Sequence, residues 1–106
     1  MKEMNRIEEQ NRQLLWRTLA ALENEAEVMR FIRELCTPQE IKAIAQRLAA
    51  AELLVQNFTY GDITKMLKGV NSTISTATIN RVNGTVKNGG GALRMIIQRT
   101  SGVEGR

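Results

Sequence analysis

Apolar residues recur every three or four positions along most of this chain, which is the spacing of amphipathic helices. The first such stripe, over residues 3–22, runs through Met4, Ile7, Asn11, Leu14, Thr18 and Leu22. The second, over residues 25–35, runs through Val28, Phe31, Ile32 and Leu35. Asn24 precedes it as a candidate helix cap. Both segments are therefore predicted to be helices whose apolar side needs a packing partner.

The four residues 37–40, TPQE, predict the start of a third helix. Thr caps a helix, Pro fits its first position, and a Glu three residues after the cap can bond back to it. This helix is predicted to begin at Pro38 and to end near Asn57. Small residues at 49–51 would let another helix approach it closely. Its stripe consists of Ile41, Ile44, Ala45, Leu48, Ala51 and Val55.

Residues 59–86 have the layout of a helix-turn-helix, in which a short helix, a turn and a second helix follow one another. Thr59 and Asp62 have the spacing of a capping box at the start of the first helix. Gly69 can adopt the positive φ that ends this helix. The apolar stripe of the helix consists of Ile63, Met66 and Leu67.

The second helix of this hairpin is predicted to start near Ser75. At about 100° per residue, one of its sides packs and the other is free to contact a partner. The packing side consists of Ser75, Ile79, Val82 and Val86, and the free side of Ala77, Asn80, Arg81 and Gly84. Hydroxyl side chains at the helix start, which let a phosphate strand approach, are Ser75, Thr76 and Thr78. Asn80 and Arg81 can pair with base edges in a major groove.

A glycine-containing run at 88–91 ends this helix, and a polar tail at 100–106 is expected to be disordered. A last short helix between them is marked by Leu93, Ile96 and Ile97. The predicted fold is therefore all-α, with six helices in a single domain over residues 1–99. Its parts are dimerisation helices over residues 1–36, a central helix over 37–58, the helix-turn-helix over 59–86 and a final helix over 91–99.

The composition suits one globular domain, with 42% apolar, 25% charged and only 4% aromatic residues. The stripes of the first two helices are too long to be covered within one chain, so we expect a homodimer. Cys36 is the only cysteine and the sequence has no histidine, which removes the usual zinc sets and His-dependent catalysis. We therefore expect no metal, no cofactor and no enzymatic activity. The absence of a long apolar run or signal peptide predicts a cytoplasmic protein that spans no membrane.

Charge is unevenly distributed along the chain. Residues 1–36 carry six Lys or Arg against seven Glu, a net charge of −1, whereas residues 37–106 carry nine against four acids, a net charge of +5. Asp62 is the only acid between positions 57 and 99. The basic residues in that span are Lys65, Lys68, Arg81, Lys87, Arg94 and Arg99. Such an excess favours a polyanionic partner, here double-stranded DNA.

The segment from Cys36 to Ile97 resembles the Trp repressor family, in particular its YerC/YecD-like branch. The resemblance is carried by CTPQEIKAIAQRL, TYGDI, STATINRVN and KNGGGALRMII. It implies an intertwined dimer of six-helix chains, with a helix-turn-helix that projects from each side and represses transcription. It also implies base-reading positions at Thr76, Ala77 and Asn80, with Gly61 and Thr64 contributing from the preceding helix. The complete predicted DNA interface is Gly61, Thr64, Lys65, Lys68, Ser75, Thr76, Ala77, Thr78, Asn80, Arg81 and Lys87.

The same resemblance implies a co-repressor pocket, to which Thr37, Arg47 and Arg81 would correspond. Val82, however, stands where the family has a close-packed glycine. Its two methyl groups would occupy volume that an indole needs, and overpacking of this kind costs about 1 to 3 kcal/mol. Facing Leu48 and Ala51 together with Val86, it would fill the space of the ligand. We therefore expect DNA binding without tryptophan, and a vestigial pocket.

Two alternatives stay open at this stage. The chain could be a protein-interaction or assembly module that keeps the fold, or a repressor that responds to a different small-molecule effector. The turn at 69–74 is about four residues longer than in relatives, which costs little loop entropy but could shift docking on DNA.

Overall fold

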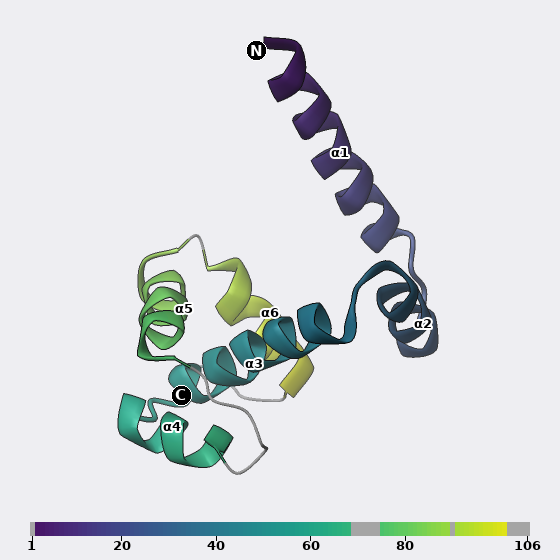
Figure 1. Cartoon of the computed structure of the whole chain (residues 1–106). Helices are drawn as coiled ribbons and strands as arrows, with labels where there is room; N and C mark the ends of the chain where they lie inside the picture. The colour runs from purple at the N-terminus through teal and green to yellow at the C-terminus, as the bar shows by residue number, and fades with distance from the viewer. Residues whose placement is uncertain (1, 69–74, 90, 102–106) are drawn as a thin grey trace. The chain divides into compact units, whose positions relative to one another are not determined.

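The computed structural model describes residues 2–68, 75–89 and 91–101. In these ranges all regular structure is α-helical, and the six helices of the predicted all-α fold are confirmed (Figure 1). The helices are α1 (Lys2–Ala20), α2 (Glu25–Leu35), α3 (Pro38–Val55), α4 (Tyr60–Lys68), α5 (Thr76–Asn88) and α6 (Ala92–Ser101).

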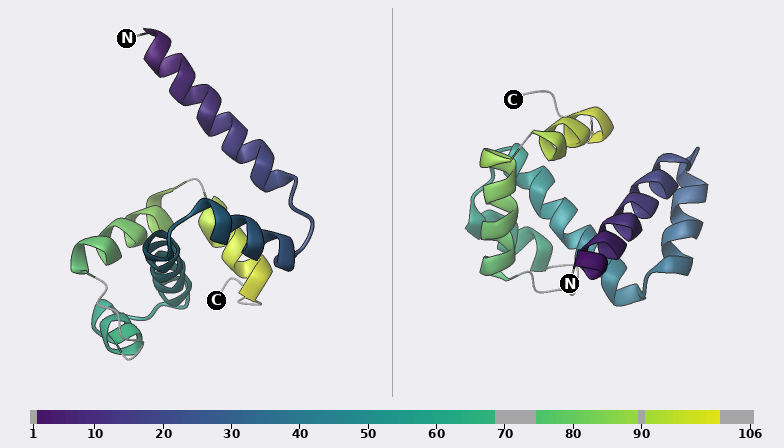
Figure 2. Two further views of the ribbon diagram at one scale, coloured as in Figure 1. Left: turned by 45° about the vertical axis from the view of Figure 1, so that its right-hand side comes forward. Right: turned by 90° about the horizontal axis from the view of Figure 1, so that it is seen from above.

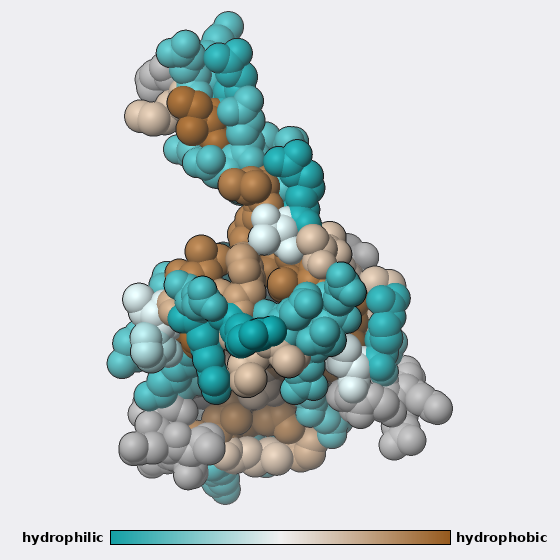
Figure 3. Space-filling view, turned by 90° about the vertical axis from the view of Figure 1, so that its right-hand side faces the viewer, coloured by the Kyte–Doolittle hydropathy of each residue, from teal (hydrophilic) through white to brown (hydrophobic). Residues whose placement is uncertain are grey.

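The chain divides into two compact units, one ending at Ile41 and the other beginning at Lys42. The predicted single domain therefore stays a prediction. In the first unit neither α1 nor α2 buries a side chain. Met4 is 66% exposed and Trp16 is 57% exposed. Figure 3 accordingly shows apolar side chains on the surface of α1, the helix in the upper part of the view.

The predicted caps of α2 and α3 are confirmed. The Asn24 side chain accepts a hydrogen bond of 2.9 Å from the Glu27 N–H. At α3, the Thr37 Oγ1 accepts from the Glu40 N–H at 3.1 Å, and the Glu40 carboxylate accepts from the Thr37 N–H at 2.8 Å. Hydrogen bonding of the Glu40 carboxylate to the backbone N–H of Thr37, and to a smaller extent to the Thr37 side chain, lowers the pKa of Glu40 below its ordinary value of 4.5.

The second unit holds the buried core. Figure 2 shows α4, α5 and α6 arranged around the carboxyl half of α3. Ala50 is 0% exposed and Ala51 is 1% exposed, so the small residues of α3 do lie where other helices approach closely. The buried residues of the described chain are Ala50, Ala51, Leu54, Val55, Ile63, Ile79, Val82, Val86 and Ile97.

Special backbone positions end α3 and separate α5 from α6. Asn57 follows α3 with a φ of 69°, a conformation that asparagine tolerates better than most residues. At Gly89 an added Cβ would lie 2.5 Å from the Thr85 carbonyl oxygen, and Gly91 has a φ of 90°. Both positions therefore require glycine, which agrees with the predicted break.

The final helix runs to Ser101 rather than to 99, so the first two residues of the predicted tail are helical. The Thr100 hydroxyl donates to the Ile96 carbonyl at 2.9 Å, as expected within a continuing helix. The stop at Gly69 and the longer turn at 69–74 lie outside the described residues, as does the tail from residue 102.

The α3 cap gives a prediction about pH. Because the pKa of Glu40 is lower in the folded chain, its carboxylate should stabilise the fold above the ordinary pKa of 4.5. That contribution should disappear as the pH falls through the lowered folded pKa. Glu40→Gln should therefore reduce the melting temperature at pH 7, and the difference from the unmodified protein should vanish at strongly acidic pH.

The control is Glu34→Gln, since Glu34 is an exposed glutamate on the neighbouring helix α2 whose carboxylate makes no hydrogen bond to the described residues. Melting curves from pH 7 to pH 3 measure the effect. A pH-independent difference for Glu40→Gln would show that the charge of the cap contributes nothing.

Candidate nucleic-acid interface

Helices α4 and α5 are the two helices of the predicted helix-turn-helix. The start of α4 is fixed by a confirmed capping box, in which the Asp62 N–H donates to the Thr59 Oγ1 at 3.1 Å and the Thr59 N–H donates to the Asp62 carboxylate at 3.3 Å. Ile63 is completely buried and anchors α4 in the core, and Leu67 is half-buried. Met66, which the stripe also included, is exposed.

The start of α5 corrects one prediction. Ser75 was assigned to the packing side, but it lies before the helix as an exposed cap. Its Oγ accepts a hydrogen bond from the Thr78 N–H at 3.1 Å and lies 2.9 Å from the Thr78 Oγ1. An N-cap residue has extended backbone angles, so the helical periodicity used for the assignment does not extend to it.

The two sides of α5 otherwise follow the predicted pattern, except that Gly84, which was placed on the free side, is half-buried. Ile79, Val82 and Val86 are buried, whereas Asn80 and Arg81 are exposed. Thr76 and Ala77 are exposed at the amino end, and Thr78 is half-buried. The buried residues hold the helix in the core, and this leaves the side chains predicted to read bases accessible.

The remaining predicted contacts lie on the same two helices. Gly61 is exposed in the first turn of α4, and an added Cβ there would meet nothing closer than 3.8 Å, so packing does not require glycine. Thr64 is exposed, and its hydroxyl donates to the Tyr60 carbonyl at 2.9 Å. Lys65 and Lys87 are exposed, and Lys68 is the last residue of α4.

One hydrogen bond between the two helices was not predicted from the sequence. The Asn83 Nδ2 donates to the Tyr60 hydroxyl at 2.8 Å in a partly buried position. Tyr60 is the first residue of α4, and its ring packs against the buried core. The sequence shows that its single tyrosine lies at a predicted helix start. The spacing of residues does not indicate that this tyrosine forms a hydrogen bond with a residue 23 positions away.

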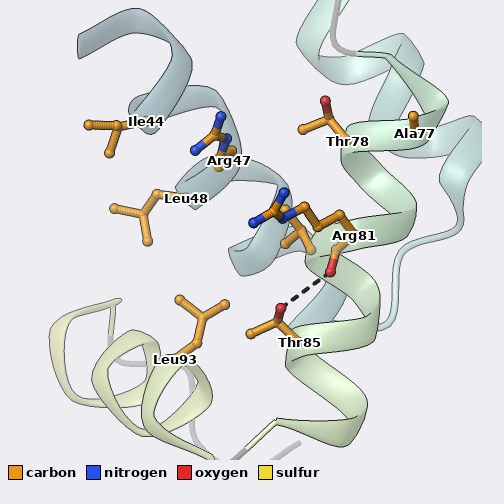
Figure 4. A pocket seen from close by; sticks show the side chains of 9 residues that line it. Ile44, Arg47, Leu48, Ala77, Thr78, Arg81, Thr85 and Leu93 are labelled. Carbon is orange, nitrogen blue, oxygen red and sulfur yellow. Dashed lines mark hydrogen bonds between the residues drawn. The ribbon is translucent and has the colours of Figure 1, made fainter. Parts of the chain in front are cut away.

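A cavity of about 510 Å³ lies between α3 and α5, next to α6. Figure 4 shows the side chains of Arg47, from α3, and Arg81, from α5, both extending into this space. No acidic residue lines it, and neither guanidinium has an ion pair within the described chain. The lining residues are Ile44, Arg47, Leu48, Ala77, Thr78, Arg81, Val82, Thr85 and Leu93.

The cavity corrects the expectation that valines fill this space. Val82 lines the cavity but leaves it open, and Val86 is not part of its wall. The cavity stays open because α5 packs tightly only against the carboxyl half of α3. The buried residues of α3 begin at Ala50, whereas the α3 residues that line the cavity lie earlier, between Ile44 and Leu48. Thr37 belongs to the first compact unit, and its hydroxyl caps α3.

Over residues 2–68, 75–89 and 91–101, no three side chains of the His, Cys, Asp or Glu type lie close enough together to hold a metal ion. No helix in these ranges has the length and apolar character needed to cross a membrane.

Comparison with known proteins places this arrangement in a family. The family model described as Trp repressor protein matches residues 10–101. The chain is 34% identical over 90 residues to the Bacillus subtilis (strain 168) protein YerC, which is described as uncharacterised, and the match covers 85% of this chain and 82% of YerC.

Two solved structures are also similar. A candidate Trp repressor from Staphylococcus aureus matches with a TM-score of 0.73 and 35% identity, and the match covers 84% of each chain. A TrpR-like protein from Eubacterium eligens ATCC 27750 matches with a TM-score of 0.78 and 29% identity, over 94% of this chain and 98% of the other. By these matches the chain belongs to the Trp repressor family, in its YerC-like branch.

Proposed function

We propose that this protein is a homodimeric, sequence-specific DNA-binding regulator that represses transcription without tryptophan as co-repressor. The observation that carries the proposal is the outward side of α5, where Asn80 and Arg81 are exposed on a helix held in the core by buried residues on its other side. An exposed, rigidly held helix with amide and guanidinium side chains suits direct reading of bases in a major groove.

The charges of the two helices support DNA as the partner. Asp62 is the only acid in α4 and α5, and it lies in the capping box. Lys65 and Lys87 are exposed and can neutralise phosphates. In this proposal the lysines and the hydroxyl of Thr76 position the helix on the backbone, and Asn80 and Arg81 discriminate bases.

The first compact unit supports the homodimer. Its helices α1 and α2 bury no side chain within the chain, although their stripes include large apolar residues such as Met4, Leu14 and Val28. Apolar surface of this extent is stable only when another surface covers it. A second copy supplies a matching stripe, and two copies would present two reading helices to two half-sites.

The dimer can be tested by sedimentation equilibrium at micromolar concentration. We expect twice the chain mass of 11.9 kDa. Leu14→Asp should shift the protein toward monomer, because it places a charge in the apolar stripe of α1. Gln13→Asp, about 100° from Leu14 on the same helix and outside the apolar stripe, is the matched control and should remain dimeric. A folded monomer for the unmodified chain would contradict the homodimer.

Sequence reading can be tested with a duplex selected from random sequences by the protein itself. Asn80→Ala should lower affinity for the selected duplex by about 5- to 150-fold, the range for one lost bidentate base contact of about 1 to 3 kcal/mol, and should change affinity for random DNA little. Lys65→Ala should weaken both and make binding less dependent on salt.

Asn88→Ala, at the carboxyl end of α5, is the control for asparagine loss in the same helix. Equal loss on selected and random DNA would show that Asn80 does not read bases. Binding that is indifferent to salt would instead favour the alternative of a protein-interaction module.

The proposal that DNA binding does not require tryptophan rests on Val82 alone, because side chains do not fill the cavity beside Val82. The Val82 side chain forms part of the cavity wall. By the resemblance described above, this is the position where the Trp repressor family has a close-packed glycine. Its methyl groups keep a planar ring from lying close against the α5 backbone. The open cavity with two unpaired arginines also supports a second candidate, in which an effector with an acidic group and an apolar part controls binding.

Calorimetry with L-tryptophan should give no binding heat for the unmodified protein, and its DNA footprint should be the same with and without tryptophan. Val82→Gly should acquire tryptophan binding, because it removes two methyl groups from the cavity wall. Val86→Gly is a close control, since Val86 is equally buried at 7% exposure on the same helix but does not line the cavity. Micromolar affinity of the unmodified chain for tryptophan would overturn this part of the proposal.

A further inference from the structure

The hydrogen bond between Asn83 and Tyr60 differs in kind from the other side-chain bonds of the molecule. It joins α5 to α4 across 23 positions, with an Nδ2 to hydroxyl distance of 2.8 Å. Among the side chains that the structure describes, every other hydrogen bond links positions no more than four residues apart. Within the part of the chain that the structure describes, it is therefore the one hydrogen bond that joins α4 to α5, the two helices of the proposed reading unit.

The tyrosine end of this bond is fixed by its surroundings. Tyr60 is half-buried, and its ring packs against the core cluster. It is also the first residue of α4, directly after Thr59, whose side chain caps the helix. Both the backbone and the ring are thus held in place, so that the hydroxyl is a fixed point on α4.

The asparagine end lies where it can control the orientation of α5. Asn83 is half-buried, follows the buried Val82, and lies about one turn after Asn80 on the same helix. The contacts of Ile79, Val82 and Val86 are apolar, and apolar burial has no preferred direction. A hydrogen bond does depend on direction, weakening steeply when it is misaligned.

We propose that Tyr60 and Asn83 are positioning residues for base discrimination, because their hydrogen bond fixes the rotation of α5 relative to α4. This inference rests on the proposed DNA-binding function. A helix that can rotate by a few tens of degrees about its axis still presents positive charge to phosphates, but it no longer aligns Asn80 with one base. The bond therefore acts on the preference for one sequence and leaves general affinity for DNA unchanged.

The test is a double-mutant cycle with Tyr60→Phe, Asn83→Ala and the combined variant. For each, the ratio of affinities for the selected duplex and a random duplex is measured at one salt concentration. Each single variant should lower the ratio about fivefold, which corresponds to about 1 kcal/mol, the usual net value of one hydrogen bond. The combined variant should lower it no further, because the same bond has already been lost.

Asn83→Asp is the conservative variant that should rescue the ratio. Its carboxylate can accept a hydrogen bond from the Tyr60 hydroxyl, so the contact is kept with donor and acceptor exchanged. The added negative charge on α5 should weaken binding to both duplexes by a similar factor. A role in folding alone would not produce this separation between affinity and preference.

Thr100→Val is the matched control, since it removes a hydroxyl whose bond at 2.9 Å stays within α6. It should leave the ratio unchanged. The concentration of active protein is determined for every variant. Partial unfolding then lowers the active fraction but does not change the ratio of affinities for the two duplexes. Tyr60→Phe keeps the packed ring and provides the decisive variant if the alanine variant fails to fold.

The outcomes separate this inference from the function on which it rests. If the unmodified protein does not distinguish the selected duplex from random DNA, the proposed function and this inference both fail. If the unmodified protein discriminates and Tyr60→Phe discriminates equally well, only the positioning role is overturned. Equal loss of affinity on both duplexes in Tyr60→Phe and Asn83→Ala would also overturn it.

Discussion

The close approach of three helices to the carboxyl half of α3 is the contact on which the rest of the second unit depends. Ala50 and Ala51 are almost fully buried because their side chains are small enough for neighbouring helices to lie against the α3 backbone. A larger side chain at either position would separate the helices and expose the core that α4, α5 and α6 share. The buried Ile63, Ile79 and Ile97 each hold one of those helices on this surface.

The exposed side of α5 is a consequence of that packing. Because a helix advances about 100° per residue, burial of Ile79, Val82 and Val86 determines which residues face outward. Asn80 and Arg81 are exposed for this reason alone, whatever they bind. The core therefore determines which side of α5 is presented, and the directional bond to Tyr60 limits how far that side can turn.

The sequence predicted what depends on near neighbours and missed what depends on distance in space. Caps at Asn24, Thr37 and Thr59 need only a partner three residues away, so their spacing is visible in the chain. Most helix sides also follow from local periodicity, but the assignment failed at Ser75, where the helix had not begun. It also failed at Ile44, Leu48 and Met66, which were placed in apolar stripes and are exposed. The Tyr60–Asn83 bond and the open cavity depend on how separate helices meet, and no local pattern specifies that geometry.

Arg81 belongs both to the proposed DNA-reading side of α5 and to the wall of the cavity. It belongs to the exposed side of α5, and its side chain also extends into the cavity toward α3, where Arg47 lies without an acidic partner among the lining residues. Two like charges in one cavity repel each other and attract an anion. A bound anion would engage the same guanidinium that is proposed to pair with DNA, so it could change DNA affinity only through its different affinities for the free and DNA-bound states. Coupling between anion binding in the cavity and binding of the DNA major groove would thus require no long-range pathway, since the Arg81 side chain alone could contact both ligands.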